Sequence, residues 1–286
     1  MLSNIVIANR RNENPLKTCQ LIKSMTKALG RILRRDPWYW LRKIHFVTGA
    51  DSSHFQSSLN LLESIRTSER FATVTFWDFG LLENEIRTLR TSFPRVNLKR
   101  FDFSKYPEFM NIRKNAGNYA WKPVAIHQTA QELSECGDEN RLLVWADAGN
   151  LILQRLTRLR GLVGLFGVYT PKSPGKLKTW THPQTLKILQ IEERLQTSPN
   201  CNAALVAIDL TSHHARELLD DWRLYAFREE CIAPKGHSLL NHRYDQAILS
   251  CLVVKRNLIP SSSLLAVEEL GVKIHQDVEV PRLLTH

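Results

Sequence analysis

The stretch LLVWADAGN, residues Leu142–Asn150, decides the expected fold. Residues 142–146 form an apolar run, which suits a strand of a parallel sheet that is covered on both faces. Ala148-Gly149-Asn150 is typical of a turn, and Asp147 stands where the strand leaves the core. In open α/β sheets, ligands bind outside the carboxyl ends of the strands. The stretch therefore predicts a parallel sheet with a carboxylate at its ligand-binding edge.

Short apolar runs and helical patterns alternate along the rest of the chain. Strands are expected at 44–48, 72–77, 96–101, 142–146 and 203–208, and helices at 55–65, 81–89 and 122–133. Such a series predicts an α/β domain with a mainly parallel central sheet flanked by helices. No further shift in composition divides it, so one domain is expected over residues 44–286.

Residues 1–43 differ from this domain in charge. They hold ten lysines or arginines against Glu13 and Asp36, which gives +8 of the net +11. Apolar residues recur at helical spacing over residues 16–35, and Trp38-Tyr39-Trp40 follows. The pattern predicts a basic amphipathic arm. Either residues 16–40 lie on an anionic membrane surface, or the apolar stripe packs on the domain. Nucleic acid is an unfavoured partner, because no recognition motif follows.

Bulk composition narrows the cellular setting. No apolar run approaches the roughly 20 residues that a membrane-spanning helix needs, and the first residues lack the pattern of a signal peptide. The five cysteines are scattered without a C-x-x-C pair, which favours reduced thiols. We therefore expect a cytoplasmic protein, which a membrane-bound arm would make peripheral at the cytoplasmic face of the inner membrane.

Several common site types are absent from the sequence. VTGADSSHF, residues 47–55, has one glycine where a dinucleotide fingerprint needs three. The P-loop, the G-x-S-x-G elbow and HExxH do not occur either. The sequence thus argues against these nucleotide, hydrolase and zinc-protease sites.

Two acidic turns are expected at the same edge of the sheet. Thr48-Gly49-Ala50-Asp51 follows the first strand, as Asp147 follows a later one. Each acid has a structural alternative: Asp51 as a helix cap, and Asp147 as an Asx turn or the cap of a helix beginning near Leu151. Sugar-nucleotide enzymes often hold a divalent ion with a D-x-D pair, but Gly149 stands where the second acid belongs. One carboxylate is a poor Mg²⁺ or Mn²⁺ site without further ligands.

Three other segments carry candidate binding residues. In NAGNYAWKP, residues 115–123, Tyr119 and Lys122 precede a helix whose start favours an anion such as a diphosphate. In NHRYDQAIL, residues 241–249, His242, Asp245 and Gln246 have the spacing of one helix face. An ordinary helix entry, and a helix capped by Asn241, are the respective alternatives. The loop PKSPGKLK, residues 171–178, is expected to be mobile, with Trp180 and His182 after it.

Taken together, these segments resemble a known family. FVTGAD, VTFWDFGL, NYAWKP, WADAGN, THP, LLDDWRLYA, ECIAP and HRYDQAIL occur in this order over residues 44–254. They are similar to a glycosyltransferase-like family of largely uncharacterised members, related to the nucleotide-diphospho-sugar transferases of GT-A fold. NYAWKP and HRYDQ are the most specific pieces.

The resemblance implies a role for each candidate residue. Donor-binding residues would be Thr48, Asp51, Tyr119, Lys122 and Asp147. The acceptor or sugar side would hold His242 and Asp245. Trp180, whose ring suits stacking on a sugar, and His182 are the further candidates for that side. Asp147 and His242 would ligate the divalent cation, Mn²⁺ or Mg²⁺. The degenerate D-x-D leaves open that Lys122 with Arg113 or Lys114 neutralises the diphosphate instead.

We therefore predict a glycosyltransferase that moves a sugar from a nucleotide-sugar donor to a glycan or glycolipid hydroxyl. In an inverting reaction Asp245, or Asp209 after the strand at 203–208, would accept the acceptor proton; a retaining route stays open. Two alternatives from other classes are a non-catalytic sugar- or nucleotide-binding relative and a membrane-surface adaptor that uses the basic arm.

Overall fold

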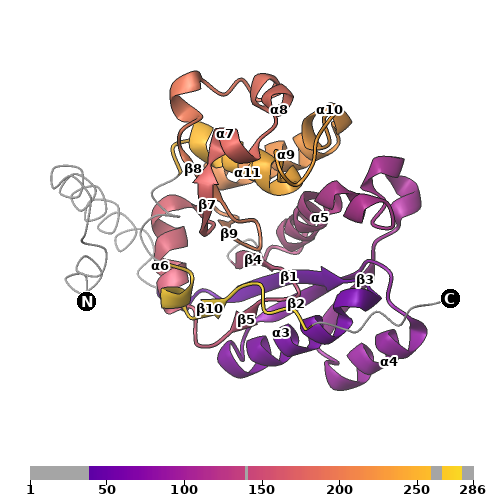
Figure 1. Cartoon of the computed structure of the whole chain (residues 1–286). Coiled ribbons are helices and arrows are strands. Elements are labelled where there is room, and N and C mark those ends of the chain that lie inside the picture. The colour runs from indigo at the N-terminus through magenta and orange to yellow at the C-terminus, as the bar shows by residue number, and fades with distance from the viewer. Residues whose placement is uncertain (1–38, 139–140, 259–265, 279–286) are drawn as a thin grey trace.

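The computed structural model describes residues 39–138, 141–258 and 266–278 of the chain. A six-stranded sheet in the order β3-β2-β1-β4-β9-β6 forms its centre (Figure 1). The strands are β1 Ile44–Ala50, β2 Thr73–Asp78, β3 Val96–Arg100, β4 Leu142–Ala146, β6 Val168–Tyr169 and β9 Leu205–Asp209. β3, β2, β1 and β4 are parallel, whereas β9 runs antiparallel to both of its neighbours. The predicted α/β architecture with a mainly parallel sheet is confirmed.

Helices cover both faces of this sheet because its central strands are apolar on both sides. Along β4, Val144 belongs to the core under α3 Phe55–Ser68 and α6 Thr157–Phe166, and Trp145 to the core under α5 Trp121–Glu135, α9 His213–Ala226 and α11 Tyr244–Lys255. All five residues of β4 are buried. In Figure 1, α5, α9 and α11 lie on one side of the sheet and α3 with α4 Glu83–Ser92 on the other.

Smaller elements complete the fold. The remaining helices are α7 Leu177–Trp180, α8 Pro183–Ile188 and α10 Glu229–Ile232. Two short antiparallel pairs join β5 Leu151–Ile152 to β10 Val272–Lys273, and β7 Lys172–Lys176 to β8 Pro199–Cys201. The 3₁₀ helices are η1 Tyr39–Leu41, η2 Ser52–His54, η3 Phe103–Lys105, η4 Glu108–Met110, η5 Asn115–Tyr119, η6 Glu193–Leu195 and η7 Glu268–Leu270.

Two local expectations are wrong. Residues 151–152 form β5 rather than the start of a helix, so Asp147 caps no helix there. Their partner is β10, a strand from the end of the chain that local periodicity does not reveal. The loop expected at residues 171–178 instead contains β7 and the start of α7, because β7 pairs with β8.

The predicted arm lies almost wholly outside the described residues, but its end is visible. Tyr39 is 3% exposed and packs with Trp40 on α6, at the two helix positions Gly161 and Gly164 that lack a side chain. Tyr39 and Trp40 are therefore packed against the described domain. In the described part of the chain, no helix has the length and apolarity to cross a membrane.

Candidate functional site

A cavity of about 540 Å³ opens at the carboxyl ends of β1 and β4. The start of α5, the first turn of α11 and the residues just before β9 form its other walls. It brings together five of the predicted site residues: Asp51, Tyr119, Lys122, Asp147 and Asp245. The parallel strands thus deliver the two acidic turns to one edge, as expected for an open α/β sheet.

Lys122 lies at the centre of the polar cluster in this cavity. Its Nζ is 2.9 Å from Asp147 Oδ1 and 3.5 Å from Asp245 Oδ2, and it donates to the Ala203 carbonyl at 3.4 Å. Trp145 Nε1 also donates to Asp147 Oδ1, at 2.6 Å. Lys122 and Asp245 are each 4% exposed, so the lysine and this acid are an ion pair withdrawn from water. Removing one member of such an ion pair leaves its partner as a buried charge without compensation.

Burial and charge shift the pKa values of both buried groups. For Asp245, burial raises the pKa to about 6 against the lowering effect of Lys122, and the neighbouring charge of Asp147 adds to the rise. For Lys122, burial lowers the pKa, but Asp147 and Asp245 together outweigh it and hold the pKa above its usual value. Lys122 therefore stays charged, whereas Asp245 changes protonation near pH 6.

A left-handed turn places Tyr119 and Lys122. All five residues of η5 have positive φ: Asn115, Ala116, Gly117, Asn118 and Tyr119, at 47°, 51°, 60°, 49° and 55°. Left-handed backbone costs roughly 1–2 kcal/mol per L-residue, and such strain gathers at functional sites.

Side-chain bonds and one glycine hold the turn. Asn118 Nδ2 donates to the Phe109 carbonyl at 2.8 Å, and Trp121 Nε1 donates to Ala116 at 2.9 Å. A side chain at Gly117 would collide with the Met110 carbonyl. NAGNYAWKP is therefore no ordinary helix entry.

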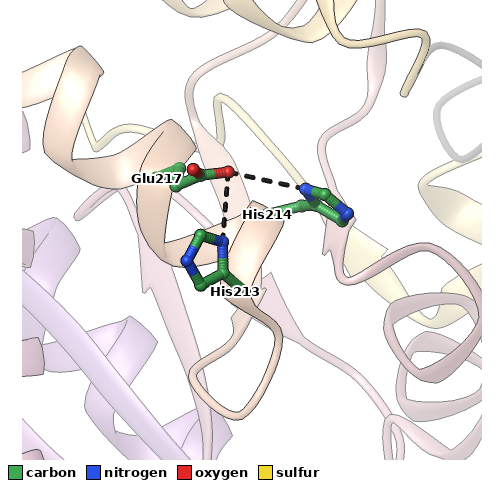
Figure 2. A group of neighbouring side chains, drawn as sticks. All are labelled: His213, His214 and Glu217. Carbon is green, nitrogen blue, oxygen red and sulfur yellow. Dashed lines mark ion pairs between the residues drawn. The ribbon is translucent and has the colours of Figure 1, made fainter.

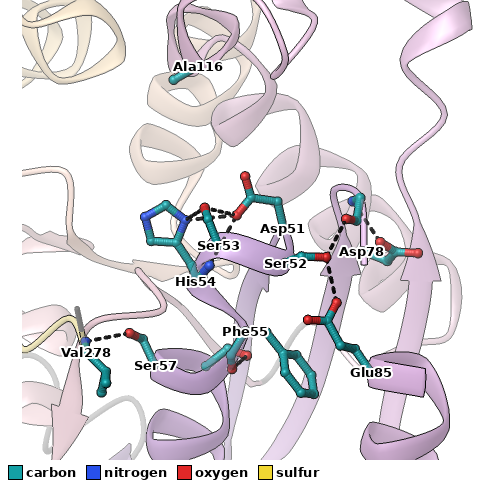
Figure 3. Close-up of polar contacts among 12 residues, drawn as sticks. Asp51, Ser52, Ser53, His54, Phe55, Ser57, Asp78, Glu85, Ala116 and Val278 are labelled. Atoms are coloured by element: carbon teal, nitrogen blue, oxygen red, sulfur yellow. Dashed lines mark hydrogen bonds and ion pairs between the residues drawn. The ribbon is translucent and has the colours of Figure 1, made fainter. Parts of the chain in front are cut away.

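Asp51 both caps a helix and lines the cavity. Its Oδ1 accepts from Ser53 Oγ at 2.6 Å and lies 2.9 Å from His54 Nδ1 (Figure 3). Burial raises the pKa of Asp51, but the hydrogen bonds from His54 and Ser53 together lower it by more, so the pKa lies below its usual value. The bond to Asp51 in turn raises the pKa of His54. Asp51 is therefore both the N-cap of η2, as the structural alternative expected, and a residue of the cavity wall.

Asp209 lies away from the cavity, at the opposite edge of the sheet. Because β9 is antiparallel to β4, Asp209 stands beside Leu142 at the start of β4. It accepts from Arg42 Nη1 at 3.1 Å and from the Tyr39 hydroxyl at 3.3 Å. The structure therefore gives it a tethering role rather than the predicted role of proton acceptor. Thr48 is fully buried in β1, and the cavity wall begins at Gly49.

His242 does not share a helix face with Asp245, because α11 begins only at Tyr244. It is fully buried, its Nε2 bonds the Ile232 carbonyl at 2.9 Å, and its Nδ1 accepts from the His182 N–H at 3.2 Å. Burial lowers the pKa of His242 to about 4. With both ring nitrogens occupied, the geometry contradicts its predicted roles as metal ligand and sugar contact.

The remaining predicted residues lie beside the cavity or away from it. His182 caps α8, where its Nδ1 accepts from the Gln184 N–H at 3.2 Å. Trp180 stacks against the Arg243 guanidinium, which does line the cavity, with Cζ 4.3 Å from the ring centroid. Arg113 and Lys114 do not line it, and Lys114 pairs with Glu108 at 2.7 Å.

Sequence reasoning missed other residues of the cavity wall. These are His54, Asn150, Asn202, Arg243, His275 and Asp277. His275 and Asp277 stand two residues apart near the end of the described chain. That spacing was the available signal, but nothing local connects it to the distant turn after β4.

A second group of metal-ligating side chains lies outside the cavity. Within the described residues, His213, His214 and Glu217 on α9 are the one such group with closely spaced ligand atoms (Figure 2). Both imidazoles face the Glu217 carboxylate, at 3.3 and 3.5 Å. All three are exposed, and the positive end of the α9 dipole disfavours a cation there.

Comparisons with known proteins agree with this architecture. A family described as "Protein of unknown function (DUF1647)" matches residues 19–127. No curated protein matches the sequence significantly. Among solved structures, the galactosyltransferase LgtC in complex with donor and acceptor sugar analogues superposes with a TM-score of 0.50 at 13% identity, covering 81% of this chain and 87% of LgtC. The chain therefore has the fold of the GT-A glycosyltransferases.

Two further solved structures are more distant. The bifunctional glycosyltransferase WbbM, in its apo form, gives a TM-score of 0.45 at 15% identity, over 74% of this chain and 37% of WbbM. Mouse xyloside xylosyltransferase 1 gives 0.46 at 12% identity, over 75% of this chain and 83% of that one. The chain thus spans little more than a third of WbbM.

Proposed function

We propose that this chain transfers a sugar from a nucleotide-sugar donor to a hydroxyl group of a glycan or glycolipid. One observation carries the proposal: a buried lysine lies between two carboxylates in a cavity at the ligand-binding edge of the sheet. Perturbed titratable groups gathered in a concave site are a mark of function. The residues in question are Lys122, Asp147 and Asp245.

In the proposed reaction, the bond from the anomeric carbon to the donor phosphate oxygen breaks and the acceptor oxygen bonds to that carbon. The nucleoside diphosphate leaves with the bonding electrons, and the acceptor proton passes to a base. Asp245 suits the base, because its pKa of about 6 keeps it largely ionised at neutral pH yet basic enough to take a proton. This assignment describes the inverting route.

The charge of the cavity argues for a cation alongside the donor. Four carboxylates line it, from Asp51, Asp147, Asp245 and Asp277, against the two permanent cations of Lys122 and Arg243. Lys122 is already neutralised by its acidic neighbours. A diphosphate would therefore enter a net negative site, which opposes binding unless a divalent ion comes with it.

The residues present fit Mg²⁺ or Mn²⁺. Both hydrogen bonds to Asp147 reach Oδ1, so Oδ2 accepts none among the described residues. Asn150 is fully buried, and its Oδ1 has no hydrogen-bond partner in the described structure. Carboxylate and amide oxygens are the ligands these ions prefer. A bound ion would supply charge neutralisation for the leaving diphosphate.

The donor would extend from this cluster toward Tyr119 and Asp51. Tyr119 is 38% exposed at the cavity wall, so its ring offers a face for a base or a sugar. Asp51 offers carboxylate oxygens to hydroxyl groups. On the acceptor side, we propose that Trp180 acts through Arg243, which its ring holds in place.

A thermal-shift panel of UDP, GDP, CDP and their sugars, with and without Mn²⁺, tests donor binding. A ligand at about 100 times its Kd should add roughly 2.7 kcal/mol to the stability of the folded chain. We expect one nucleotide series to raise Tm in this way. The absence of any nucleotide-dependent shift would overturn the proposal.

Lys122→Met tests the central lysine. The variant keeps most of the side-chain volume but leaves Asp147 and Asp245 without their cation, so we expect loss of donor binding. Lys114→Met is the matched control, because Lys114 is an ion-paired lysine outside the cavity. Equal donor binding by both variants would remove Lys122 from the site.

A further inference from the structure

Gly149 stands where the second acid of a D-x-D pair would be, and the structure gives a reason for the glycine. A Cβ at this position would fall directly on the carboxylate of Asp277. Gly149 is not among the residues with positive φ, so its backbone accepts any side chain. A side chain at position 149 would therefore displace the Asp277 carboxylate, whereas the turn itself does not demand glycine.

The end of the described chain is fixed where it passes this turn. β10 pairs with β5 just beyond Asn150, and the Gln276 N–H donates to the Gly149 carbonyl at 2.6 Å. One residue past Asp277, the Val278 N–H donates to Ser57 Oγ at 2.9 Å (Figure 3). Contacts on both sides thus hold the Asp277 backbone against the turn that carries Asp147.

The residue after Gly149 carries a buried oxygen without a hydrogen-bond partner in the described residues. Asn150, next to Gly149, donates from Nδ2 to the Ala204 carbonyl at 2.7 Å, which fixes the orientation of its amide. Its Oδ1 is left without a hydrogen-bond partner in the described residues, although the side chain is fully buried and lines the cavity. A buried acceptor without a donor is costly, so a ligand that binds oxygen is expected at this point.

We infer that Asp277 supplies the second carboxylate of a divalent-cation site, together with Asp147 and the Asn150 amide oxygen. The acid that the turn lacks in sequence comes from a segment more than a hundred residues later in the numbering. The inference rests on the proposed function, in which the ion accompanies a nucleoside diphosphate. It goes beyond that proposal by assigning the ion to a residue outside the turn.

Mn²⁺ binding to the full chain, without nucleotide, gives a readout that is independent of activity. We would titrate Mn²⁺ and follow the free ion by electron paramagnetic resonance. Asp277→Asn, which removes the charge but keeps the shape of the side chain, should weaken the affinity for Mn²⁺ at least tenfold. Asp102→Asn is the control, because Asp102 is a half-exposed acid outside this cavity, and should bind as the unmodified chain does.

Moving the carboxylate gives a sharper test. Gly149→Asp combined with Asp277→Gly restores a D-x-D turn and removes the collision, so Mn²⁺ affinity should return to within about threefold of the original. Gly149→Asp alone keeps the collision with the Asp277 carboxylate, so this variant should not bind Mn²⁺ with normal affinity. Mn²⁺ affinity in Asp277→Asn equal to that of the unmodified chain would overturn the inference.

Nucleotide binding separates this inference from the proposed function. If the unmodified chain binds a nucleotide but no Mn²⁺, the proposed function stands and the cation site is wrong. If it binds Mn²⁺ through Asp277 but no nucleotide, the cation site stands and the proposed function is wrong. Near-ultraviolet circular dichroism confirms that each variant is folded before its affinity is compared.

Discussion

Asp147 and Asp209 both stand at the end of a buried strand next to a basic side chain, but they lie at opposite edges of the sheet. Asp147 directly follows a fully buried strand and Asp209 closes one; Asp147 pairs with Lys122 at 2.9 Å, and Asp209 pairs with Arg42 at 3.1 Å. β4 runs parallel to β1, so Asp147 reaches the edge that carries the cavity. β9 runs against β4, so Asp209 reaches the other edge.

The difference teaches that strand direction decides which edge an acid reaches. The apolar run and the terminal acid look alike in both segments, and neither shows which way its strand will pair. At the far edge, Asp209 holds Arg42 and Tyr39, which join the first described residues to the sheet. Four substitutions or conditions test this division between a chemical and a structural edge.

We expect the largest effect from Asp147→Asn, which should reduce the rate of sugar transfer. The substitution removes one of the two carboxylates that hold Lys122 and, under our proposal, a cation ligand. Losing one electrostatic contact of this kind costs about 100-fold or more in turnover. Sugar transfer from the donor found in the nucleotide panel is the measurement. Normal turnover in a folded Asp147→Asn protein would contradict the chemical role of this edge.

Asp209→Asn should show the reverse pattern. The carboxylate is buried and accepts charge-assisted bonds, so its neutralisation should lower the free energy of unfolding by about 1–3 kcal/mol. Turnover at a temperature where the variant is folded should stay within about twofold of the original. Urea unfolding gives the first quantity and the transfer assay the second. A selective loss of turnover would return Asp209 to the site.

Asp245 should make both turnover and stability depend on pH. Because its pKa is raised to about 6, the proposed base is protonated below that pH, and turnover should fall as pH decreases through about 6. The sign for stability is opposite. The folded form binds this proton more tightly than the unfolded form, so the stabilising contribution is full below about pH 4 and is lost as pH rises through about 6.

A pH series of turnover and of the urea midpoint measures both trends. The stability trend should disappear in Asp245→Asn, which has no proton to exchange. Activity that stays level down to pH 5 would show that Asp245 is not the proton acceptor.

The smallest effect is expected for His54→Gln. The Asp51–His54 pair lines the cavity but is partly exposed, with His54 56% exposed at the side chain, so its loss should cost less than about 1 kcal/mol. The bond to Asp51 raises the pKa of His54. The contribution should therefore be present below about pH 6.5 and vanish as pH rises through the raised value. Melting curves at pH 5.5 and 8.5 measure the difference.

Local pattern was enough for the strands and helices that bury a continuous apolar face. β4 matches its expected range at both ends, and β1, β2, α3 and α5 lie close to theirs. The turns after β1 and β4 brought Asp51 and Asp147 to one cavity, because parallel strands share a carboxyl edge. The first turns of α5 and α11 added Lys122 and Asp245.

The misses all depend on contacts between distant parts of the chain. The direction of β9 is set by its place between β4 and β6. His242 looked like a partner of Asp245 on one helix face, but α11 begins two residues after it. Asp277 has no local signal that connects it to Gly149.

The strand order has a consequence for how the chain acquires its site during synthesis. β1 pairs on one side with β2, which follows closely, and on the other with β4, which begins only at Leu142. At translation rates of about 5–20 residues per second, one edge of β1 waits unpaired for several seconds. An exposed apolar edge is a template for aggregation. The nascent chain should thus be most vulnerable before residue 142 emerges. The cavity is complete only after Asp245 and Asp277 have followed.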